Sequence, residues 1–167
     1  MRILGIDPGI AIVGYCIVDT DKDEYRLITS GSIQTDKNKS DSGRLYEICQ
    51  DLEEIIKKYS PDCAGVEKLY FFKNQKTIIP VAQARGVIMM TLEKYSINAV
   101  EYTPIVVKQT ITGYGRASKD EVACAVEKMI NKNDKTWPKL DDTVDSIAIA
   151  VCHARNIECN LAQYVNA

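Results

Sequence analysis

The sequence predicts an α/β domain in which a mixed, five-stranded sheet carries helices on both faces. Strand-like runs open the chain, and the remainder alternates short apolar strands with helical periodicity. The 167 residues are 46% hydrophobic and 26% charged, which is typical of a globular protein. This length is enough for one substantial core, so we expect a single domain over residues 1–167.

The first third of the chain predicts a meander of three strands and then a helix. Turn-forming segments, Pro8-Gly9 and residues 19–24, separate strands at Ile3–Asp7, Ile12–Asp19 and Tyr25–Gln34. A helix is expected over Ser42–Tyr59, where apolar residues recur at intervals of three and four. Pro61-Asp62 ends this helix and leads into a fourth strand at residues 63–67.

The rest of the chain predicts one more strand and four helices. A helix over Thr77–Tyr95, with Pro80 near its start, precedes the fifth strand at Asn98–Tyr102. Two shorter helices follow, one from about Pro104 and one over Lys119–Asn131, and the loop Gly113–Ser118 separates them. A second loop, Asn131–Leu140, leads to the last helix at about Asp142–Cys159.

Charge is unevenly distributed along the chain. The net charge of −2 does not indicate a generally basic nucleic-acid binder. Between Lys68 and Arg116, however, seven basic residues face only two acids, whereas acids outnumber bases from Asp19 to Asp62. A polyanion would meet the middle third, unless these bases form an ordinary solvated helix face.

The cysteines and the N-terminus indicate a reducing, cytoplasmic location. None of the six cysteines forms a C-x-x-C pair and most lie in apolar runs, so we interpret them as free thiols. Cys152 and His153 lack further zinc ligands at suitable spacing. The chain shows no secretion signal and no apolar run near the roughly 20 residues that span a bilayer, so no membrane association is expected.

Four carboxylates stand where core elements end or begin. Asp7 and Glu67 end apolar strands, and Asp142 and Asp145 open the last helix on one face. Each alone has a structural interpretation as a turn former, a strand-end acid or a helix cap. Together they predict a divalent-metal centre, because charged groups on core elements are costly without an offsetting charge.

Six segments in register resemble the RuvC family of Holliday-junction resolvases, which has a ribonuclease H-like fold. They span nearly the whole chain and read G-I-D-P-G, E-K-L-Y-F-F-K-N, Q-A-R-G, V-K-Q-T, G-Y-G-R-A-S-K and D-D-T-V-D-S-I-A-I-A. The resemblance implies a structure-specific endodeoxyribonuclease that resolves four-way DNA junctions by paired nicks, in homologous recombination and DNA repair.

The resemblance also implies the catalytic residues. Asp7, Glu67, Asp142 and Asp145 match the family's acids, and would hold two Mg²⁺ ions, for which Mn²⁺ can substitute. Lys108 and Lys119 match basic residues that would hold the scissile phosphate, although either could be an ordinary surface lysine. Asp141 lies four residues before Asp145 and is the alternative to Asp142; the D-x-x-D spacing favours Asp142.

The resemblance further implies DNA-binding residues and partners. The DNA-binding candidates are Tyr70, Phe71, Phe72, Lys73, Lys76, Arg85 and Arg116. The aromatic segment could instead pack beneath its loop, and Arg85 could be a packing residue. The implied partners are junction DNA, a second copy of the chain, and the branch-migration proteins RuvA and RuvB. The helix Thr77–Tyr95 is the candidate dimer surface.

Three other functions remain to be separated from this one. Another ribonuclease H-like nuclease, acting on RNA or on non-junction DNA, would use the same acids. An actin-like nucleotide-binding module would need a second domain and more glycine-rich motifs than nine glycines in 167 residues allow. A non-catalytic DNA-binding protein would gain affinity by losing the four acids.

Overall fold

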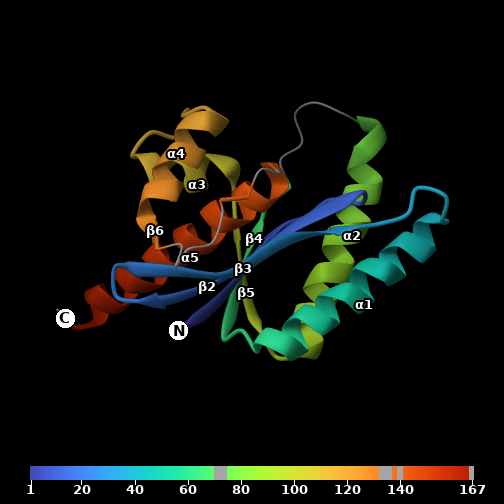
Figure 1. The fold of residues 1–167 in the computed structure, drawn as a ribbon, viewed down its shortest axis with the longest axis horizontal. Helices are drawn as coiled ribbons and strands as arrows, with labels where there is room; N and C mark the ends of the chain where they lie inside the picture. Colours follow the sequence, from blue (N-terminus) through green and yellow to red (C-terminus); the bar gives the residue numbers. More distant parts are fainter. Residues whose placement is uncertain (70–74, 132–136, 139–140, 166–167) are drawn as a thin grey trace.

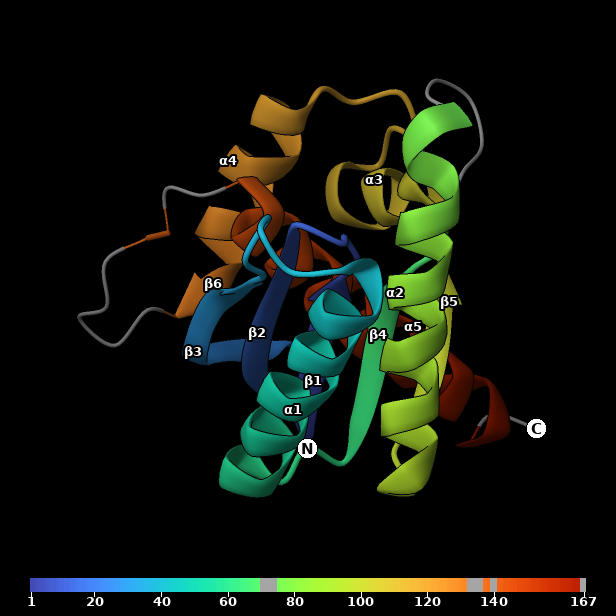
Figure 2. The same cartoon turned by 90° about the vertical axis from the view of Figure 1, so that its right-hand side faces the viewer.

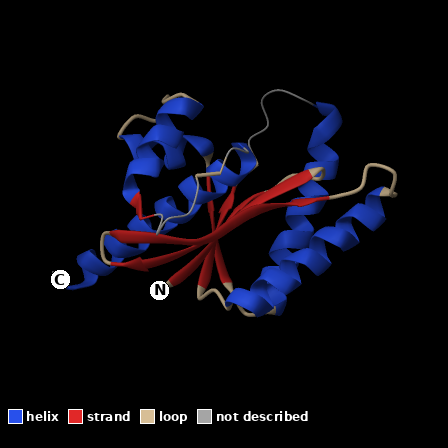
Figure 3. Cartoon of the chain, viewed as in Figure 1, coloured by secondary structure: helices blue, strands red, loops and turns tan. Residues whose placement is uncertain are grey.

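The computed structural model describes residues 1–69, 75–131, 137–138 and 141–165, with side chains described for these residues except 75–77 and 158–165. The described strands form one mixed sheet in the order β5-β4-β1-β2-β3-β6 (Figures 1 and 3). The strands are β1 (Arg2–Asp7), β2 (Ile12–Asp21), β3 (Glu24–Gln34), β4 (Cys63–Glu67), β5 (Asn98–Tyr102) and β6 (Ile130–Asn131).

The sheet confirms the predicted meander and the mixed pairing. β1, β2 and β3 are antiparallel neighbours, whereas β4 lies parallel to β1 and β5 parallel to β4. The prediction of five strands was wrong for the described residues, because a short sixth strand pairs with β3. The helix expected to reach Asn131 ends at Met129, where the buried, β-branched Ile130 takes an extended conformation opposite Tyr25.

Helices cover both faces of the sheet, as predicted. The described helices are α1 (Asp41–Tyr59), α2 (Gln75–Lys94), α3 (Pro104–Thr112), α4 (Lys119–Met129) and α5 (Asp141–Val165). Figure 2 shows α1 and α2 in front of the sheet and α5 behind it. Two buried apolar clusters correspond to these layers, one beneath α1 and α2 and the other beneath α3, α4 and α5.

Two glycines let α5 lie directly on the middle of the sheet. A Cβ atom on Gly14 of β2 would lie 1.9 Å from the carbonyl oxygen of Asp142, and one on Gly5 of β1 would lie 2.1 Å from that of Ser146. No real Cβ atom approaches a carbonyl so closely, so any larger residue would push the helix outward. The backbone of α5 therefore reaches the strands only because these positions lack side chains.

We expect Gly14→Ala to lower the free energy of unfolding by about 2–3 kcal/mol, as overpacking of a rigid core does. Gly86→Ala on α2 is the matched control, because nothing lies within 4 Å of its Cβ position. That change should instead add about 0.5–1 kcal/mol by restricting the unfolded chain. Denaturant unfolding of both variants tests this, and equal stabilities would contradict the close approach of α5.

Two further features concern the environment of the chain. No helix within the described residues combines the length and apolarity needed to cross a bilayer. Cys16, Cys49, Cys63, Cys124 and Cys152 are all free thiols, and Cys159 lies outside the described side chains.

Candidate active site

Three of the four predicted carboxylates line one cavity of about 300 Å³ at an end of the sheet. Asp7 ends β1 and Glu67 ends β4, and these strands are parallel neighbours whose last registered pair is Ile6 and Val66. Asp145, from the first turns of α5, completes the acidic wall. Two lysines, Lys108 and Lys119, line the same cavity, as do Pro104, Val107, Val122, Ala148 and Ile149.

The pleat of the strands directs the two strand acids toward α5. The Cβ positions of Gly5 and Gly65 face α5, where Ser146 and Ile149 lie close to them. Because side chains alternate along a strand, the residue two positions later lies on the same face. That residue is Asp7 after Gly5 and Glu67 after Gly65, so each acid is the first side chain past the point where α5 touches its strand.

Burial and neighbouring carboxylates raise the pKa of both strand acids, Asp7 and Glu67. The pKa of Asp7 rises to about 9, first because burial disfavours its charge and then because Glu67, Asp145 and Asp142 are negative neighbours. Burial and the charge of Asp145 also raise the pKa of Glu67, which accepts a hydrogen bond from the Asp7 carboxyl. The site therefore holds a proton at neutral pH unless a cation offsets the negative charge.

Two lysines from separate helices supply positive charge. The Lys119 ammonium donates a hydrogen bond to Oδ2 of Asp145 over 2.8 Å, and this bond raises the pKa of Lys119. Lys108 is half-buried in α3, where it lies near enough to Glu67 for its charge to oppose the rise in the Glu67 pKa. Both lysines thus line the same cavity as the acids.

The structure distinguishes Asp141 from Asp142. Asp142 is half-buried above Gly14, the partner of Asp7 across the β1–β2 ladder, and its charge acts on Asp7. Asp141 is exposed and acts on Lys119. Asp142 does not line the cavity itself, but its position beside Asp7 favours it over Asp141 as the fourth acid.

The carboxylates of the cavity are suitable ligands for a hard divalent cation, although their side chains are not already arranged around one binding position. Carboxylate oxygens are the preferred protein ligands of Mg²⁺. Among the described residues, no group of three or more His, Cys, Asp or Glu side chains is arranged to hold a metal ion. Binding would require Asp7 to release its proton and Asp145 to turn from Lys119, and both changes are local.

The DNA-binding candidates have different positions. Tyr70, Phe71, Phe72 and Lys73 lie outside the described residues, as does the side chain of Lys76. Arg116 is exposed in the α3–α4 connection, three residues before Lys119. The Arg85 guanidinium is instead held by both carboxylate oxygens of Glu101 on β5, at 2.6 and 2.5 Å. This pair fixes α2 to the edge of the sheet.

The sequence reasoning did not identify the glycines that bring the acids together. Gly5 and Gly14 were read only as parts of strands, yet they determine how near α5 comes to Asp7. A signal was available, because glycine inside a strand commonly marks the close approach of another backbone. Gly5 and Gly65 each stand two residues before a predicted catalytic acid.

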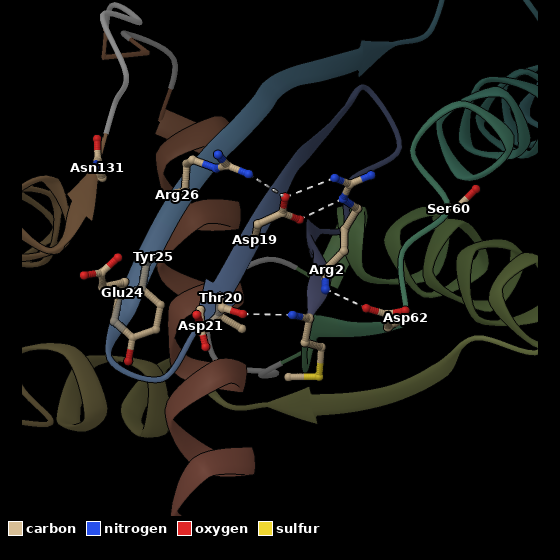
Figure 4. Close-up of a pocket in the computed structure, with 11 residues that line it drawn as sticks. Arg2, Asp19, Thr20, Asp21, Glu24, Tyr25, Arg26, Ser60, Asp62 and Asn131 are labelled. Carbon is tan, nitrogen blue, oxygen red and sulfur yellow. Dashed lines mark hydrogen bonds and ion pairs between the residues drawn. The ribbon is translucent and has the colours of Figure 1, made fainter.

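A larger hollow of about 810 Å³ lies at the opposite end of the sheet, beside the start of β1. Figure 4 shows Arg2 and Arg26 converging on Asp19, while the N-terminal ammonium donates to the Thr20 carbonyl. Through these ion pairs the Asp19 carboxylate joins its own strand, β2, to both β1 and β3. These contacts indicate a structural network that secures the start of β1, so the acidic cavity is the candidate active site.

Comparison with known proteins places this geometry among junction nucleases. The family model described as crossover junction endodeoxyribonuclease RuvC matches residues 3–153. The chain is 46% identical over 160 residues to the protein of that name from Halothermothrix orenii, covering 96% of each chain.

Solved structures agree with this comparison. Thermus thermophilus RuvC in complex with a Holliday junction substrate superposes with a TM-score of 0.88 at 27% identity, covering 96% of each chain. The yeast mitochondrial Holliday junction resolvase Ydc2 has a TM-score of 0.67 at 16% identity, covering 96% of this chain and 84% of its own, and shows the shared fold alone.

Proposed function

The chain belongs to the RuvC family of crossover junction endodeoxyribonucleases, and we propose from its site that it resolves four-way DNA junctions by hydrolysing one phosphodiester bond in each of two strands. The observation that carries the proposal is the convergence of Asp7, Glu67 and Asp145 with Lys108 and Lys119 on one cavity. The relative from T. thermophilus, which has the same fold, binds such a junction.

RuvC-family nucleases depend on a metal, and we assign this role here to Mg²⁺ held by Asp7, Glu67, Asp142 and Asp145. When bound, the metal supplies Lewis acidity and lowers the pKa of water for attack on phosphorus. The chain's own part is to release the Asp7 proton and to supply carboxylates from β1, β4 and α5 at one end of the sheet. The raised pKa of Asp7 reflects its burial and then the negative charge of its neighbours.

The two lysines would bind and stabilise the phosphate. Lys119 lies on the α4 side of the cavity and Lys108 on the α3 side, so a phosphate drawn into the cavity meets positive charge from two directions. A fixed ammonium beside the phosphate oxygens offsets the charge that develops as water attacks. Arg116 is exposed in the connection between α3 and α4, and it would contact the DNA backbone farther from the cleaved bond.

The alternative function is that of a ribonuclease H-like nuclease acting on RNA or on non-junction DNA. Incubation of the protein with Mg²⁺ and a synthetic four-way junction, a linear duplex or an RNA–DNA hybrid of matched sequence separates the two. We expect cleavage of the junction alone. Equal cleavage of the duplex or the hybrid would support the alternative and overturn junction specificity.

A dimer would supply the two equivalent active sites that paired nicks need. Along α2, Ile79, Gln83 and Met90 are exposed at helical spacing on one face. Ile79 is 68% exposed and Met90 55%, which is unusual for large apolar side chains on a monomer surface. We assign the dimer surface to this face.

We expect Met90→Glu to weaken dimerisation at least about tenfold, because it places a charge in the middle of the apolar face. Tyr46→Glu on α1 is the matched control, since Tyr46 is 64% exposed but lies outside this face. Sedimentation equilibrium should show monomers for the first variant and dimers for the second. A Met90→Glu protein as dimeric as the wild type would show that another surface is used.

The remaining partners and the location stay predictions. The family resemblance implies RuvA and RuvB as partners, and the cytoplasmic location remains a proposal. Pull-down of RuvA–RuvB–junction complexes with the purified chain would test the first of these.

A further inference from the structure

The two lysines of the cavity belong to different helices, and a short turn sets the distance between them. Lys108 lies in α3, which ends at Thr112, and Lys119 is the first residue of α4. Residues 113–118 connect the helices at the surface. Any change in the conformation of this turn would move Lys119 relative to Lys108 and Asp145.

The side chain of Gln109 bridges the turn at both of its amide atoms. Nε2 donates a hydrogen bond to the carbonyl of Gly113 over 2.8 Å, and Oε1 accepts one from the amide of Gly115 over 3.0 Å. The carbonyl of Gln109 also accepts from the amide of Gly113, which has a left-handed conformation with φ of 77°. One residue therefore binds the turn at three backbone groups.

Neighbouring contacts fix the rest of the connection. The Thr112 hydroxyl accepts from the amide of Tyr114, and the Tyr114 carbonyl accepts from the amide of Ala117. Ser118 and Glu121 then form a capping box that sets the start of α4 at Lys119. Together with the Gln109 contacts, these bonds hold the backbone at several points between Thr112 and the first turn of α4, where Lys119 lies.

We propose that Gln109 is a positioning residue for catalysis, whose amide holds the 113–115 turn and so places Lys119 at the cavity. The inference rests on the proposed function of Lys119 in junction cleavage. Gln109 is itself exposed and does not line the cavity, so its effect passes through the turn. The turn demands one donor and one acceptor on the same side chain, which only an amide of this length provides.

The test compares Gln109→Ala and Gln109→Glu with the control Gln50→Ala. Gln50 is also an exposed helical glutamine, but it lies in α1, on the other face of the sheet. A synthetic four-way junction is cut under single-turnover conditions in Mg²⁺, and its affinity is measured by fluorescence anisotropy in EDTA. Exchange of the Gly115 amide is followed by NMR in the same proteins.

We expect Gln109→Ala to slow cleavage by about tenfold to a hundredfold, as small misplacements of catalytic groups do, with a smaller change in junction affinity. The Gly115 amide should exchange faster in this variant, while the melting temperature stays near that of the wild type. Gln109→Glu should not restore the rate at pH 8, because a carboxylate cannot donate to the Gly113 carbonyl. Gln50→Ala should behave as the wild type.

Two results would overturn the inference. Unchanged exchange at Gly115 in Gln109→Ala would show that the amide does not hold the turn. Faster exchange with an unchanged cleavage rate would show that the turn does not position Lys119. A wild-type protein that cuts no junction would instead contradict the proposed function, and faster exchange at Gly115 would still be measurable in that case.

Discussion

Replacing Asp7 with Asn is expected to abolish junction cleavage and, in the absence of metal, to stabilise the protein at pH 8. Both effects arise from the burial of this side chain beside other carboxylates. The Asp7 carboxylate is needed to hold the metal, but without metal the folded protein keeps this buried side chain protonated beside Glu67, Asp145 and Asp142, whereas the unfolded chain ionises it. Asparagine keeps the shape of the protonated acid and removes the charge.

The pH dependence gives the direction of the effect. The pKa of Asp7 is about 9 in the folded protein against 3.8 ordinarily, so the folded state keeps a proton that the unfolded chain releases. Stability from this group is therefore greatest below pH 4 and falls as the pH rises toward 9, by up to about 1.4 kcal/mol per pH unit. Asp7→Asn should flatten this fall and match the wild type near pH 4.

Thermal unfolding in EDTA from pH 4 to pH 9 measures the effect. Each kcal/mol should raise the melting temperature by roughly 2–4 °C in a domain of this size. Asp23→Asn, in the exposed β2–β3 turn, is the matched control and should change neither stability nor cleavage. A metal-free Asp7→Asn protein less stable than the wild type at pH 8 would show that the Asp7 side chain makes favourable contacts that the structure does not contain.

Replacing Lys119 with Ala is expected to slow cleavage by about a hundredfold or more, the scale found when one electrostatic donor to a transition state is removed. Its ammonium lies at the cavity and pairs with Asp145 over 2.8 Å. The variant loses the positive charge that would meet the phosphate and leaves Asp145 without its partner. The loss should appear in the single-turnover rate more than in junction affinity, because Lys119 is one of several cationic contacts.

Lys128→Ala provides the control on the same helix. Lys128 is exposed in the last turn of α4, away from the cavity, so its removal should leave the cleavage rate unchanged. If the two variants weaken junction binding equally and cleave at the wild-type rate once bound, Lys119 is a general DNA contact and has no part in catalysis.

The position of the acids could be predicted from the sequence because it follows from elementary topology. The carboxyl ends of parallel strands lie at the same edge of a sheet, so two acids that end such strands lie at one edge. Because β1 pairs directly with β4, Asp7 and Glu67 are also neighbours there. The D-x-x-D spacing placed Asp142 and Asp145 on one side of a helix. The resemblance then supplied the ribonuclease H-like fold, which periodicity alone does not give.

Features that depend on contacts between distant segments could not be predicted in this way. The close approach of α5 to Gly5 and Gly14 can be predicted only when the place where α5 crosses the strands is known. The Arg85–Glu101 ion pair likewise depends on the position of α2 against β5. The two-residue strand β6 was missed because Lys119–Asn131 continues a helical pattern until Ile130 finds a pairing partner on β3. Tertiary pairing determined the ending of this helix, against its local propensity.

The most direct test of the account follows all four strands of a synthetic junction, each labelled in turn, with the protein in Mg²⁺ or in EDTA. We predict nicks at symmetry-related phosphates in two strands of like polarity, only when metal is present, and none with Asp7→Asn. Cleavage that persists in EDTA, or nicks that appear without symmetry on all four strands, would contradict a metal-dependent resolvase built on these carboxylates.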